Sequence, residues 1–552
     1  MNMIESAKAQ VRQLTVAAYE KAAAAGMLPA GIAVEPAVEI PKDTTNGDYT
    51  TTFCLAAAKA MKMNPRQVAQ TLIDHTTLTD SYFTSVEIAG PGFMNFRLGE
   101  KWFSDTVSGI ETAGEKYGEN DTLAGRKYMV EFVSANPTGP MHMGNARGGV
   151  LGDTLASVLQ KSGADVWREF YVNDAGNQIE KFGKSLAIRY LQLYKGEDAC
   201  PLPEECYQGA DIIARAKEFA EVHGDAYVNK DFDELKKAIV ADALPKNIAG
   251  LQRDLGKYRI QYDVWFHESD LHSSGAVKAV VDKLLETGAC YKAEDGAIMY
   301  RSAQYAAKYG VVNKRKTDDG SEEEAKDEVL VRANGIPTYF AADIAYHYNK
   351  LVTRGYDKAI DIFGADHHGY IPRMKAALTA LGVDANKLDI VIMQMVNLVR
   401  NGEKYKLSKR SGKAITLSTL LEEIPIDAAR FFFNLREPNS HFDFDLDLAV
   451  EKSSQNPVYY VQYAHARICS LITNLKAEGF EAEDYSIENL SVLDKPQEIE
   501  LIRQLAALPN EIDNAAKTYD PAKITKYSVE LATLFHKFYD VCSVKNAESE
   551  EL

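Results

Sequence analysis

The stretch from residue 128 to residue 163 constrains the fold more than any other part of the chain. Residues 128–133 form an apolar run that is typical of a buried strand. The turn-forming residues 136–140, Asn-Pro-Thr-Gly-Pro, end that strand. Apolar side chains then recur at helical spacing from Val150 to Leu159, and Gly163 ends the helix. A strand, a turn and a helix in this order are typical of an open α/β sheet.

His142 lies in the connection between this strand and this helix, in the segment Pro-Met-His-Met-Gly-Asn that ends at Asn145. In open α/β sheets this position binds phosphate, because the carboxyl edge of the sheet meets the N-terminus of a helix. His142 can donate a hydrogen bond to a phosphate or ribose oxygen, and Gly144 lets the backbone approach a nucleotide closely. The alternative is that His142 only caps the helix, which would leave this anion site without a use.

A second motif lies far along the chain, at residues 406–413, Lys-Leu-Ser-Lys-Arg-Ser-Gly-Lys. Lys406 and Lys409 can neutralise a leaving pyrophosphate, and Gly412 suits a loop that closes over it. The alternative for such a basic run is a solvated surface strip. The two motifs resemble a pair of elements found in nucleotidyl transferases, and this resemblance implies attack on ATP at its α-phosphate. Catalysis would then rest on positioning and on donors aimed at the phosphoryl oxygens.

Composition argues against several classes of protein. No stretch is long and apolar enough to span a membrane, and the Ala-rich N-terminus with its mixed charges lacks the pattern of a secretory signal. The net charge of −17 argues against a protein that coats nucleic acid, although local basic patches can still bind one folded RNA. The six cysteines include no Cys-x-x-Cys pair, which argues against structural zinc and fits a reducing compartment. We therefore expect a cytoplasmic protein.

The chain of 552 residues is long enough for about three or four domains. Alternating apolar residues around Gly90 and helical patterns before them predict an α+β domain over residues 1–110. Residues 122–370 hold the parallel sheet, with a charged helical insertion near 191–256 and a strand over residues 260–266. Residues 371–425 connect this sheet-containing domain to the C-terminal domain, and they carry the lysine loop (406–410). From about Asp427 the chain is predicted to be wholly helical, so residues 426–552 form an all-α bundle with a strong helix start at Asn456-Pro457.

The two motifs resemble the His-x-Gly-His and Lys-Met-Ser-Lys-Ser elements of class I aminoacyl-tRNA synthetases. Within that class, five segments are similar to the arginyl-tRNA synthetase family. They are EFVSANPTGPMHMGN (131–145), TYFAADIAYH (338–347), FGADHHGY (363–370), DAAR (427–430) and NPVYYVQYAHAR (456–467). The resemblance implies a Rossmann-like catalytic domain between an N-terminal domain that touches the tRNA elbow and a helical domain that reads the anticodon. It also implies arginine, ATP and tRNA as partners, with tRNA bound before the first step. We expect a monomer.

The resemblance assigns roles in arginine binding. Glu131, Ser134 and Asn136 are implied to hold the amino acid, its α-amino group included, while Tyr339 and Asp343 receive the guanidinium side. A guanidinium is planar and permanently charged, and a carboxylate such as Asp343 offers it two parallel acceptors. Tyr339 and Asp343 are four residues apart and share a face of a predicted helix. The alternative for Asp343 is a surface acid in the first turn of that helix.

The implied ATP contacts include the four residues predicted to be catalytic, which are His142, Asn145, Lys406 and Lys409. The further ATP contacts are Gly144, Gly364, Asp366 and His368. The Asp-His-His cluster at 366–368 is a candidate metal site, but it supplies no separate fourth ligand. We therefore predict no protein metal site, and Mg²⁺ that arrives with ATP as a bridge between phosphates.

Three tyrosines of the helical region, Tyr459, Tyr460 and Tyr463, are candidates for stacking on anticodon bases. The alternative is that they form the core of the bundle. The sequence departs from the family pattern at Asn145, where a second His is usual, and at Leu407 and Arg410 of the lysine loop. It also ends before one more helix that the family leads us to expect.

Three other functions fit the sequence less well. Another nucleotidyl transferase would not need the helical C-terminal domain, and a synthetase for another amino acid would not need Asp343. A catalytically inactive tRNA-binding protein would need neither Lys409 nor His142.

Overall fold

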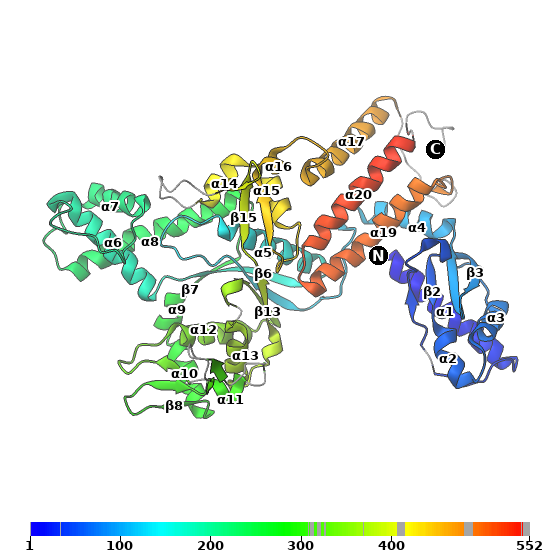
Figure 1. The fold of residues 1–552 in the computed structure, drawn as a ribbon, viewed down its shortest axis with the longest axis horizontal. Helices are drawn as coiled ribbons and strands as arrows, with labels where there is room; N and C mark the ends of the chain where they lie inside the picture. Colours follow the sequence, from blue (N-terminus) through cyan, green and yellow to red (C-terminus); the bar gives the residue numbers. More distant parts are fainter. Residues whose placement is uncertain are drawn as a thin grey trace. The chain divides into compact units, whose positions relative to one another are not determined.

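The computed structural model describes residues 2–33, 35–306, 309, 314–316, 322–324, 327–367, 369–405, 415–479, 490–542 and 544. The chain forms two compact units (Figure 1). One unit comprises Met1–Asn120, Tyr460–Asn514 and Lys526–Leu552, and the other comprises Asp121–Tyr459 and Ala515–Thr525.

The centre of the second unit is a five-stranded parallel sheet in the order β14-β13-β5-β6-β7. The strands are β5 (Lys127–Glu131), β6 (Asp165–Val172), β7 (Val264–His267), β13 (Lys358–Gly364) and β14 (Leu388–Met393). The chain runs outward from β5 through β6 to β7, and then returns to β13 on the other side of β5. This reversal forms a switch point at the carboxyl ends of β5 and β13, and at such a point an open α/β sheet has its ligand-binding crevice.

Helices and a small antiparallel sheet surround this crevice. The helices are α5 (Gly144–Lys161), α9 (Glu268–Ser273), α10 (Ala276–Glu286), α11 (Ser302–Ala306), α12 (Tyr339–Tyr348) and α13 (Tyr370–Ala380). The strands are β8 (Cys290–Lys292), β9 (Ile298–Tyr300) and β12 (Glu328–Val331), and β10 (Lys314–Lys316) pairs separately with β11 (Glu322–Glu324). α12 packs against α10 in a core that includes Ile344 and Leu284, both fully buried.

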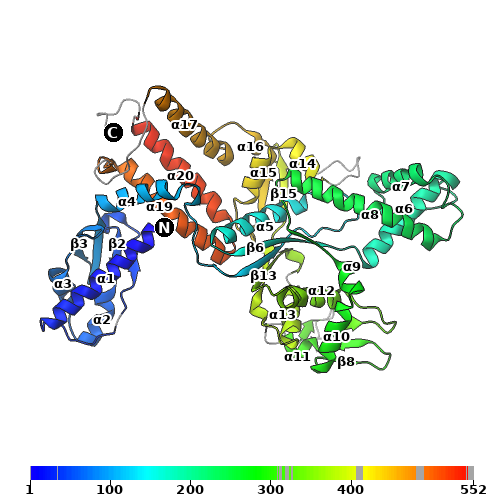
Figure 2. The ribbon, with the colours of Figure 1, turned by 180° about the vertical axis from the view of Figure 1, so that it is seen from behind.

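Three helices, α6 (Gly176–Lys195), α7 (Ala210–His223) and α8 (Phe232–Lys257), are inserted between β6 and β7. Figures 1 and 2 show them gathered in one body, with α8 leading back toward the sheet. The strand predicted over residues 260–266 is only half correct, because β7 begins at Val264. Tyr262 packs its ring 4.6 Å from that of Phe132 and donates its hydroxyl to the Phe132 carbonyl, and no strand pairing is formed over 260–263.

After β14 the chain builds a second small sheet. β15 (Val396–Arg400) pairs with β16 (Glu403–Lys404) and, in parallel, with β17 (Phe442–Asp445). α14 (Leu417–Glu423), α15 (Ile426–Phe433) and α16 (Leu446–Val450) pack nearby. The prediction of a wholly helical chain from about Asp427 is therefore wrong at β17. The alternation Phe-Asp-Phe-Asp has period two, which suits a strand with Phe444 buried.

The first unit joins the N-terminal α+β domain to the long C-terminal helices. Its sheet has the order β1-β2-β4-β3, from Val38–Glu39, Tyr49–Thr51, Phe93–Leu98 and Phe83–Ala89. Its helices are α1 (Met3–Ala24), α2 (Phe53–Met61), α3 (Pro65–His75) and α4 (Glu100–Ala113), with most of α17 (Pro457–Ala477), α19 (Pro496–Thr518) and α20 (Ala522–Val541). Ile502 and Ala506 of α19 enter the N-terminal core, and Arg503 forms an ion pair of 2.5 Å with Asp48.

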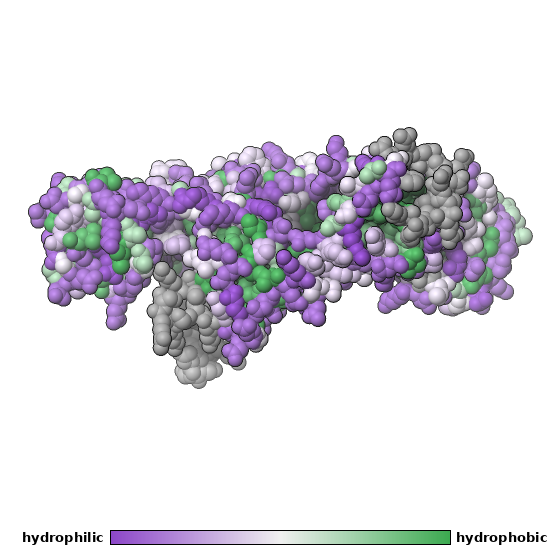
Figure 3. All heavy atoms as spheres, turned by 90° about the horizontal axis from the view of Figure 1, so that it is seen from above, coloured by the Kyte–Doolittle hydropathy of each residue, from purple (hydrophilic) through white to green (hydrophobic). Residues whose placement is uncertain are grey.

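No helix among the described residues is long and apolar enough to cross a membrane. The face of the molecule in Figure 3 is largely hydrophilic, with hydrophobic residues exposed in small groups.

Candidate active site

His142 lies in the connection between β5 and α5, as predicted, and its side chain is exposed. Its Nδ1 atom accepts a hydrogen bond of 3.0 Å from the backbone N–H of Gly144, which assigns the ring proton to Nε2. A Cβ atom at Gly144 would lie only 3.0 Å from that Nδ1 atom, so glycine lets the turn close. Nε2 can then donate a hydrogen bond to a ligand.

The end of the lysine loop is attached to this turn. Thr416 forms an antiparallel bridge with His142. On either side, Met143 N–H donates to the Ile415 carbonyl at 2.8 Å and Leu417 N–H donates to the Met141 carbonyl at 2.9 Å. Lys406 and Lys409 lie outside the described residues, but the residue that follows their loop is fixed beside His142.

The backbone turns sharply where β5 ends. Val133 and Ser134 have φ angles of 70° and 43°, in the left-handed region that costs a non-glycine residue about 1–3 kcal/mol. The turn brings the Ser134 hydroxyl within 2.8 Å of Oε1 of Glu131, and the N–H of Tyr171 donates to that hydroxyl at 3.1 Å. Backbone strain of this kind persists only where surrounding contacts hold it in place. Here the hydrogen bonds of the Ser134 hydroxyl with Glu131 and Tyr171 hold the strained turn. Asn136 follows on the exposed part of the loop.

A buried lysine holds the other oxygen of Glu131. Lys350 lies in the π-helix Asn349–Thr353, a form often found at functional sites. Its Nζ atom donates to Glu131 at 2.5 Å and to Asp361 at 2.8 Å, and His347 Nε2 lies 2.7 Å from the second oxygen of Asp361. Burial raises the pKa of Glu131, with Lys350 opposing that rise. Burial acts on Asp361 in the same sense, but Lys350 and His347 prevail and lower its pKa to about 2.

Asp343 lies on α12, as predicted, and forms part of a group of carboxylates. Its Oδ2 atom accepts a hydrogen bond of 2.6 Å from Tyr370. Burial raises the pKa of Asp343, and burial together with the charge of Asp343 raises the pKa of Glu268. The pKa of the Tyr171 phenol is raised far above its usual range, first by burial and then by Glu268, Asp343 and Glu131. These three carboxylates therefore all act on one phenol and make its surroundings negative.

Tyr339, at the start of α12, is 43% exposed, and its hydroxyl accepts a hydrogen bond of 2.9 Å from the N–H of Asn177. Tyr339 and Asp343 thus lie on the same helix, α12.

The other predicted nucleotide contacts follow β13. Gly364 ends that strand, and Asp366 lies in the 3-10 turn Ala365–His367. The side chain of Asp366 and the whole of His368 lie outside the described residues. Asn145 lies in the first turn of α5. Within the described part of the chain, no group of three or more His, Cys, Asp or Glu side chains could hold a metal ion.

Sequence reasoning missed Glu268 and Lys350. Glu268 follows β7 directly, and an acid at the carboxyl end of a strand was a signal that could have found it. Lys350 gave no such signal, because its partners are far away in sequence.

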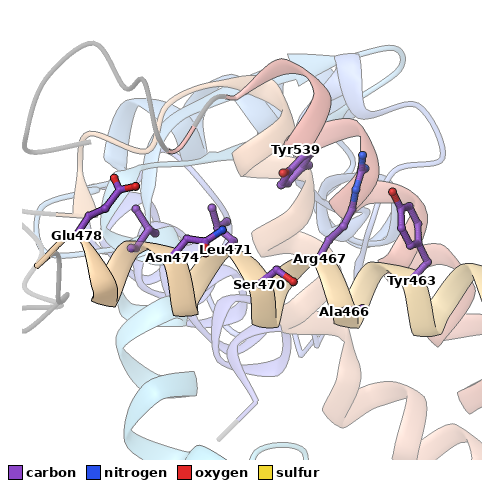
Figure 4. Close-up of a pocket in the computed structure, with 9 residues that line it drawn as sticks. Tyr463, Ala466, Arg467, Ser470, Leu471, Asn474, Glu478 and Tyr539 are labelled. Carbon is purple, nitrogen blue, oxygen red and sulfur yellow. The ribbon is translucent and has the colours of Figure 1, made fainter.

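The three predicted tRNA-stacking tyrosines lie on α17 in different surroundings. The Tyr460 ring lies 4.7 Å from that of His536 and packs against the bundle core, and Tyr459 is half-buried. Tyr463 is 44% exposed, and the Arg467 guanidinium lies 4.9 Å from its ring and 4.4 Å from that of Tyr539. Figure 4 shows Tyr463, Arg467 and Tyr539 along one open pocket. The volume of this pocket is about 260 Å³.

A parallel sheet with its switch point at β5, a histidine turn at that point and a second loop attached to the turn are the features of a class I aminoacyl-tRNA synthetase catalytic domain. Family models match the chain in three stretches. They are the arginyl tRNA synthetase N terminal domain (residues 9–98), the catalytic domain of tRNA synthetases class I (R) (residues 106–472) and the DALR anticodon binding domain (residues 461–552).

Relatives agree with these matches. An arginine–tRNA ligase of Acetivibrio thermocellus is 49% identical over 547 residues, 99% of this chain and 94% of the relative. One of Bacillus cereus is 43% identical over 554 residues, 100% of this chain and 95% of the relative. The solved Thermus thermophilus arginyl-tRNA synthetase shares the fold, with a TM-score of 0.66 at 20% identity over 98% of this chain and 92% of that one. The chain belongs to the arginyl-tRNA synthetase family. The predicted family and fold class are thereby confirmed.

Proposed function

We propose that this chain is an arginine–tRNA ligase. The arginine carboxylate attacks the α-phosphorus of ATP, a new oxygen–phosphorus bond forms, and pyrophosphate leaves with the old one. The arginyl group then passes from the adenylate to the 3′-terminal adenosine of the tRNA, and AMP is released. The observation that carries this proposal is the group of carboxylates around Tyr171, next to the His142 turn.

The charge of this pocket matches arginine. Within the described residues, Asp343 and Glu268 contact no lysine or arginine side chain, and Glu131 shares Lys350 with Asp361. A carboxylate without a cation is costly to keep away from water. Arginine supplies two cations, a planar guanidinium and an α-ammonium group, and so relieves the excess of negative charge at both ends.

We assign Asp343, Tyr339 and Glu268 to the guanidinium end of the substrate. Glu131 and Ser134 lie at the end of β5, nearer the nucleotide turn, and we assign them with Asn136 to the α-amino end. A neutral amino acid would leave the Asp343 and Glu268 charges unmatched, so the same pocket excludes it.

We assign the nucleotide to the His142 turn and the end of β13. The residues proposed to contact ATP are His142, Gly144, Asn145, Gly364, Asp366, His368, Lys406 and Lys409. Mg²⁺ is proposed to arrive with ATP as a bridge between its phosphates. Lys406 and Lys409 then meet the charge that moves onto pyrophosphate as it leaves.

The domain roles, the monomeric state and the cytoplasmic location stay predictions. The N-terminal domain is proposed to contact the tRNA elbow, and the surface around Tyr463 is proposed to contact anticodon bases.

The test is ATP–pyrophosphate exchange with each amino acid, in the presence and absence of tRNA for arginine. We expect exchange with arginine and only when tRNA is present. Exchange with another amino acid alone would overturn the arginine assignment, and tRNA binding without any exchange would indicate a catalytically inactive binding protein.

A further inference from the structure

We infer that the helical insertion α6–α8 positions the two halves of the active site, and that Asn247 is the residue through which it holds the nucleotide turn. The inference rests on the proposed function, since it concerns how the site for arginine and ATP is held in shape. It gives a role to a segment that the reaction itself does not use.

The insertion is a self-supporting body. Phe182 and Tyr190 of α6, Phe219 of α7 and Leu235 of α8 are buried in a core of their own. This core does not depend on the sheet for its apolar contacts. A body of this kind can act as a rigid support, because its shape is set by its own packing.

Asn247 connects this body to the nucleotide turn. It lies on α8, is 8% exposed, and donates from Nδ2 to the carbonyl of Pro137 at 3.0 Å. Its Oδ1 atom accepts a hydrogen bond of 2.8 Å from Nε of Arg215 on α7. Both ends of the amide are therefore used, and its orientation is fixed by a partner that can only donate.

Pro137 lies between the end of β5 and His142, so its carbonyl is part of the turn that presents the histidine. Pro137 is buried, and leaving a buried carbonyl without a donor is costly. The hydrogen bond from Asn247 therefore satisfies a buried carbonyl of the turn and holds the turn in place. A second point of approach lies at the start of α7. Gly139 of the same turn leaves room for the carboxylate of Asp211, in the first turn of α7, which lies 3.1 Å from the position of an added Cβ.

The insertion also contacts the arginine end of the site. The N–H of Asn177, in the first turn of α6, donates to the Tyr339 hydroxyl at 2.9 Å. Gly176 beside it has a φ of +74°, and a Cβ atom there would lie 3.0 Å from that hydroxyl. Glycine therefore allows the start of α6 to approach Tyr339 closely.

One rigid body thus touches the turn that holds ATP and the tyrosine beside the guanidinium pocket. Attack of the arginine carboxylate on the α-phosphorus needs both substrates in register, and a shift of about 1 Å can cost about a hundredfold in rate. Asn247 is a positioning residue in this scheme, since it acts on the substrates through Pro137 and touches neither of them.

Asn247→Asp tests the inference. The aspartate keeps the size of the side chain and the acceptor for Arg215, but it cannot donate to the Pro137 carbonyl. We expect kcat for arginine-dependent exchange to fall by about tenfold to a hundredfold. The circular dichroism spectrum and KM for tRNA should stay close to those of the unmodified chain, and the melting temperature should fall by a few degrees at most, because one buried carbonyl loses its donor.

Lys184→Ala is the matched control. Lys184 is on α6 in an exposed ion pair of 2.9 Å with Glu205, and this variant should keep full activity. If Asn247→Asp does not fold, Asn247→Ala, which also removes the donor to the Pro137 carbonyl, replaces it, and a folded Asn247→Ala protein should show the same fall in kcat. A folded Asn247→Asp or Asn247→Ala protein with unchanged kcat would overturn the inference. Failure of the unmodified chain to catalyse exchange would instead overturn the proposed function.

Discussion

Lys350 reaches Glu131 across 219 positions of sequence, and its Nζ atom lies 2.5 Å from Oε2 of that carboxylate. Lys350 is fully buried, and a buried charge is stable only when it is paired and hydrogen-bonded. The second partner, Asp361 on β13, lies 2.8 Å away. One ammonium group therefore joins the two strands that border the crevice, and it leaves the other Glu131 oxygen to Ser134.

Lys350→Met is expected to lower the free energy of unfolding by about 3–5 kcal/mol, because two buried carboxylates lose their cation. Urea unfolding measures this loss. In the protein that still folds, the pKa of Glu131 should rise further, so KM for arginine should increase most at low pH. The control is Lys358→Met, which removes a partly exposed ion pair of 2.7 Å with Asp389 and should cost about 0–1 kcal/mol. Equal losses in the two variants would contradict a special role for Lys350.

Asp343→Asn is expected to lower kcat/KM for arginine. The corresponding loss of transition-state stabilisation is about 2–5 kcal/mol, the cost typical of breaking a buried charge pair. The amide cannot offer two acceptors to a guanidinium, whereas the nucleotide turn is untouched, so KM for ATP should hold. Steady-state exchange kinetics measure both constants. Asp282→Asn, which alters an exposed pair with Lys278 on α10, is the control. Unchanged kcat and KM for arginine in Asp343→Asn would refute the assignment.

Arginine binding is expected to weaken on acidification. The pKa values of Asp343 and Glu268 are both raised, so these groups become neutral at a higher pH than exposed carboxylates, while the guanidinium stays charged. The charge of Asp343 raises the pKa of Glu268, so Glu268→Gln removes the carboxyl group that this coupling keeps neutral up to a higher pH. The rise of KM for arginine should then move to lower pH, although KM near neutral pH is larger. A pH profile of KM for arginine measures both effects, and an unshifted profile in Glu268→Gln would count against the coupling.

The same two groups also affect stability. Their pKa values are higher in the folded chain than in the unfolded chain, so without arginine they lower stability as pH rises above the unfolded value of about 4. Glu268→Gln should therefore be at least as stable as the unmodified chain near neutral pH, and arginine should stabilise it less.

Local sequence patterns predicted the parts of the site that depend on local structure. The strand expected over 128–133 is β5, and Tyr339 and Asp343 lie on one helix, as expected. Buried strands and helix starts are set by nearby residues, so their patterns can be recognised in one sequence.

Other features depend on contacts between distant segments. The π-helix that turns Lys350 inward follows no apolar period, and the pairing of β17 with β15 joins segments about 45 residues apart. Glu268 acquires its role only when β7 takes its place in the sheet beside β6. The turn at Val133 and Ser134 requires φ angles that neither residue favours, so no propensity predicts it.

Lys409→Ala is expected to slow adenylation by about a hundredfold to a thousandfold while arginine still binds, because one donor to the leaving pyrophosphate is lost. The bridge between His142 and Thr416 fixes the end of this loop beside the nucleotide turn. Single-turnover adenylate formation measures the rate, and arginine binding is followed by calorimetry with tRNA present. Lys404→Ala, on exposed β16, should have little effect. An equal loss of binding and rate would indicate misfolding instead.

Tyr463→Ala is expected to weaken tRNA binding by about 1–3 kcal/mol, the value of one base stacked on an aromatic ring. Tyr463 is exposed and lies with Arg467 and Tyr539 along one pocket, whereas Tyr460 packs against the bundle core. An aromatic ring with a guanidinium beside it suits an unpaired base next to its phosphate. KM for tRNA should therefore rise, while kcat for exchange at saturating tRNA should hold, because the arginine and ATP contacts are unchanged. Tyr194→Ala removes an equally exposed tyrosine from α6 and serves as the control. If both variants bind tRNA as the unmodified chain does, the α17 surface does not contact bases, and Tyr463 only shields the end of the bundle.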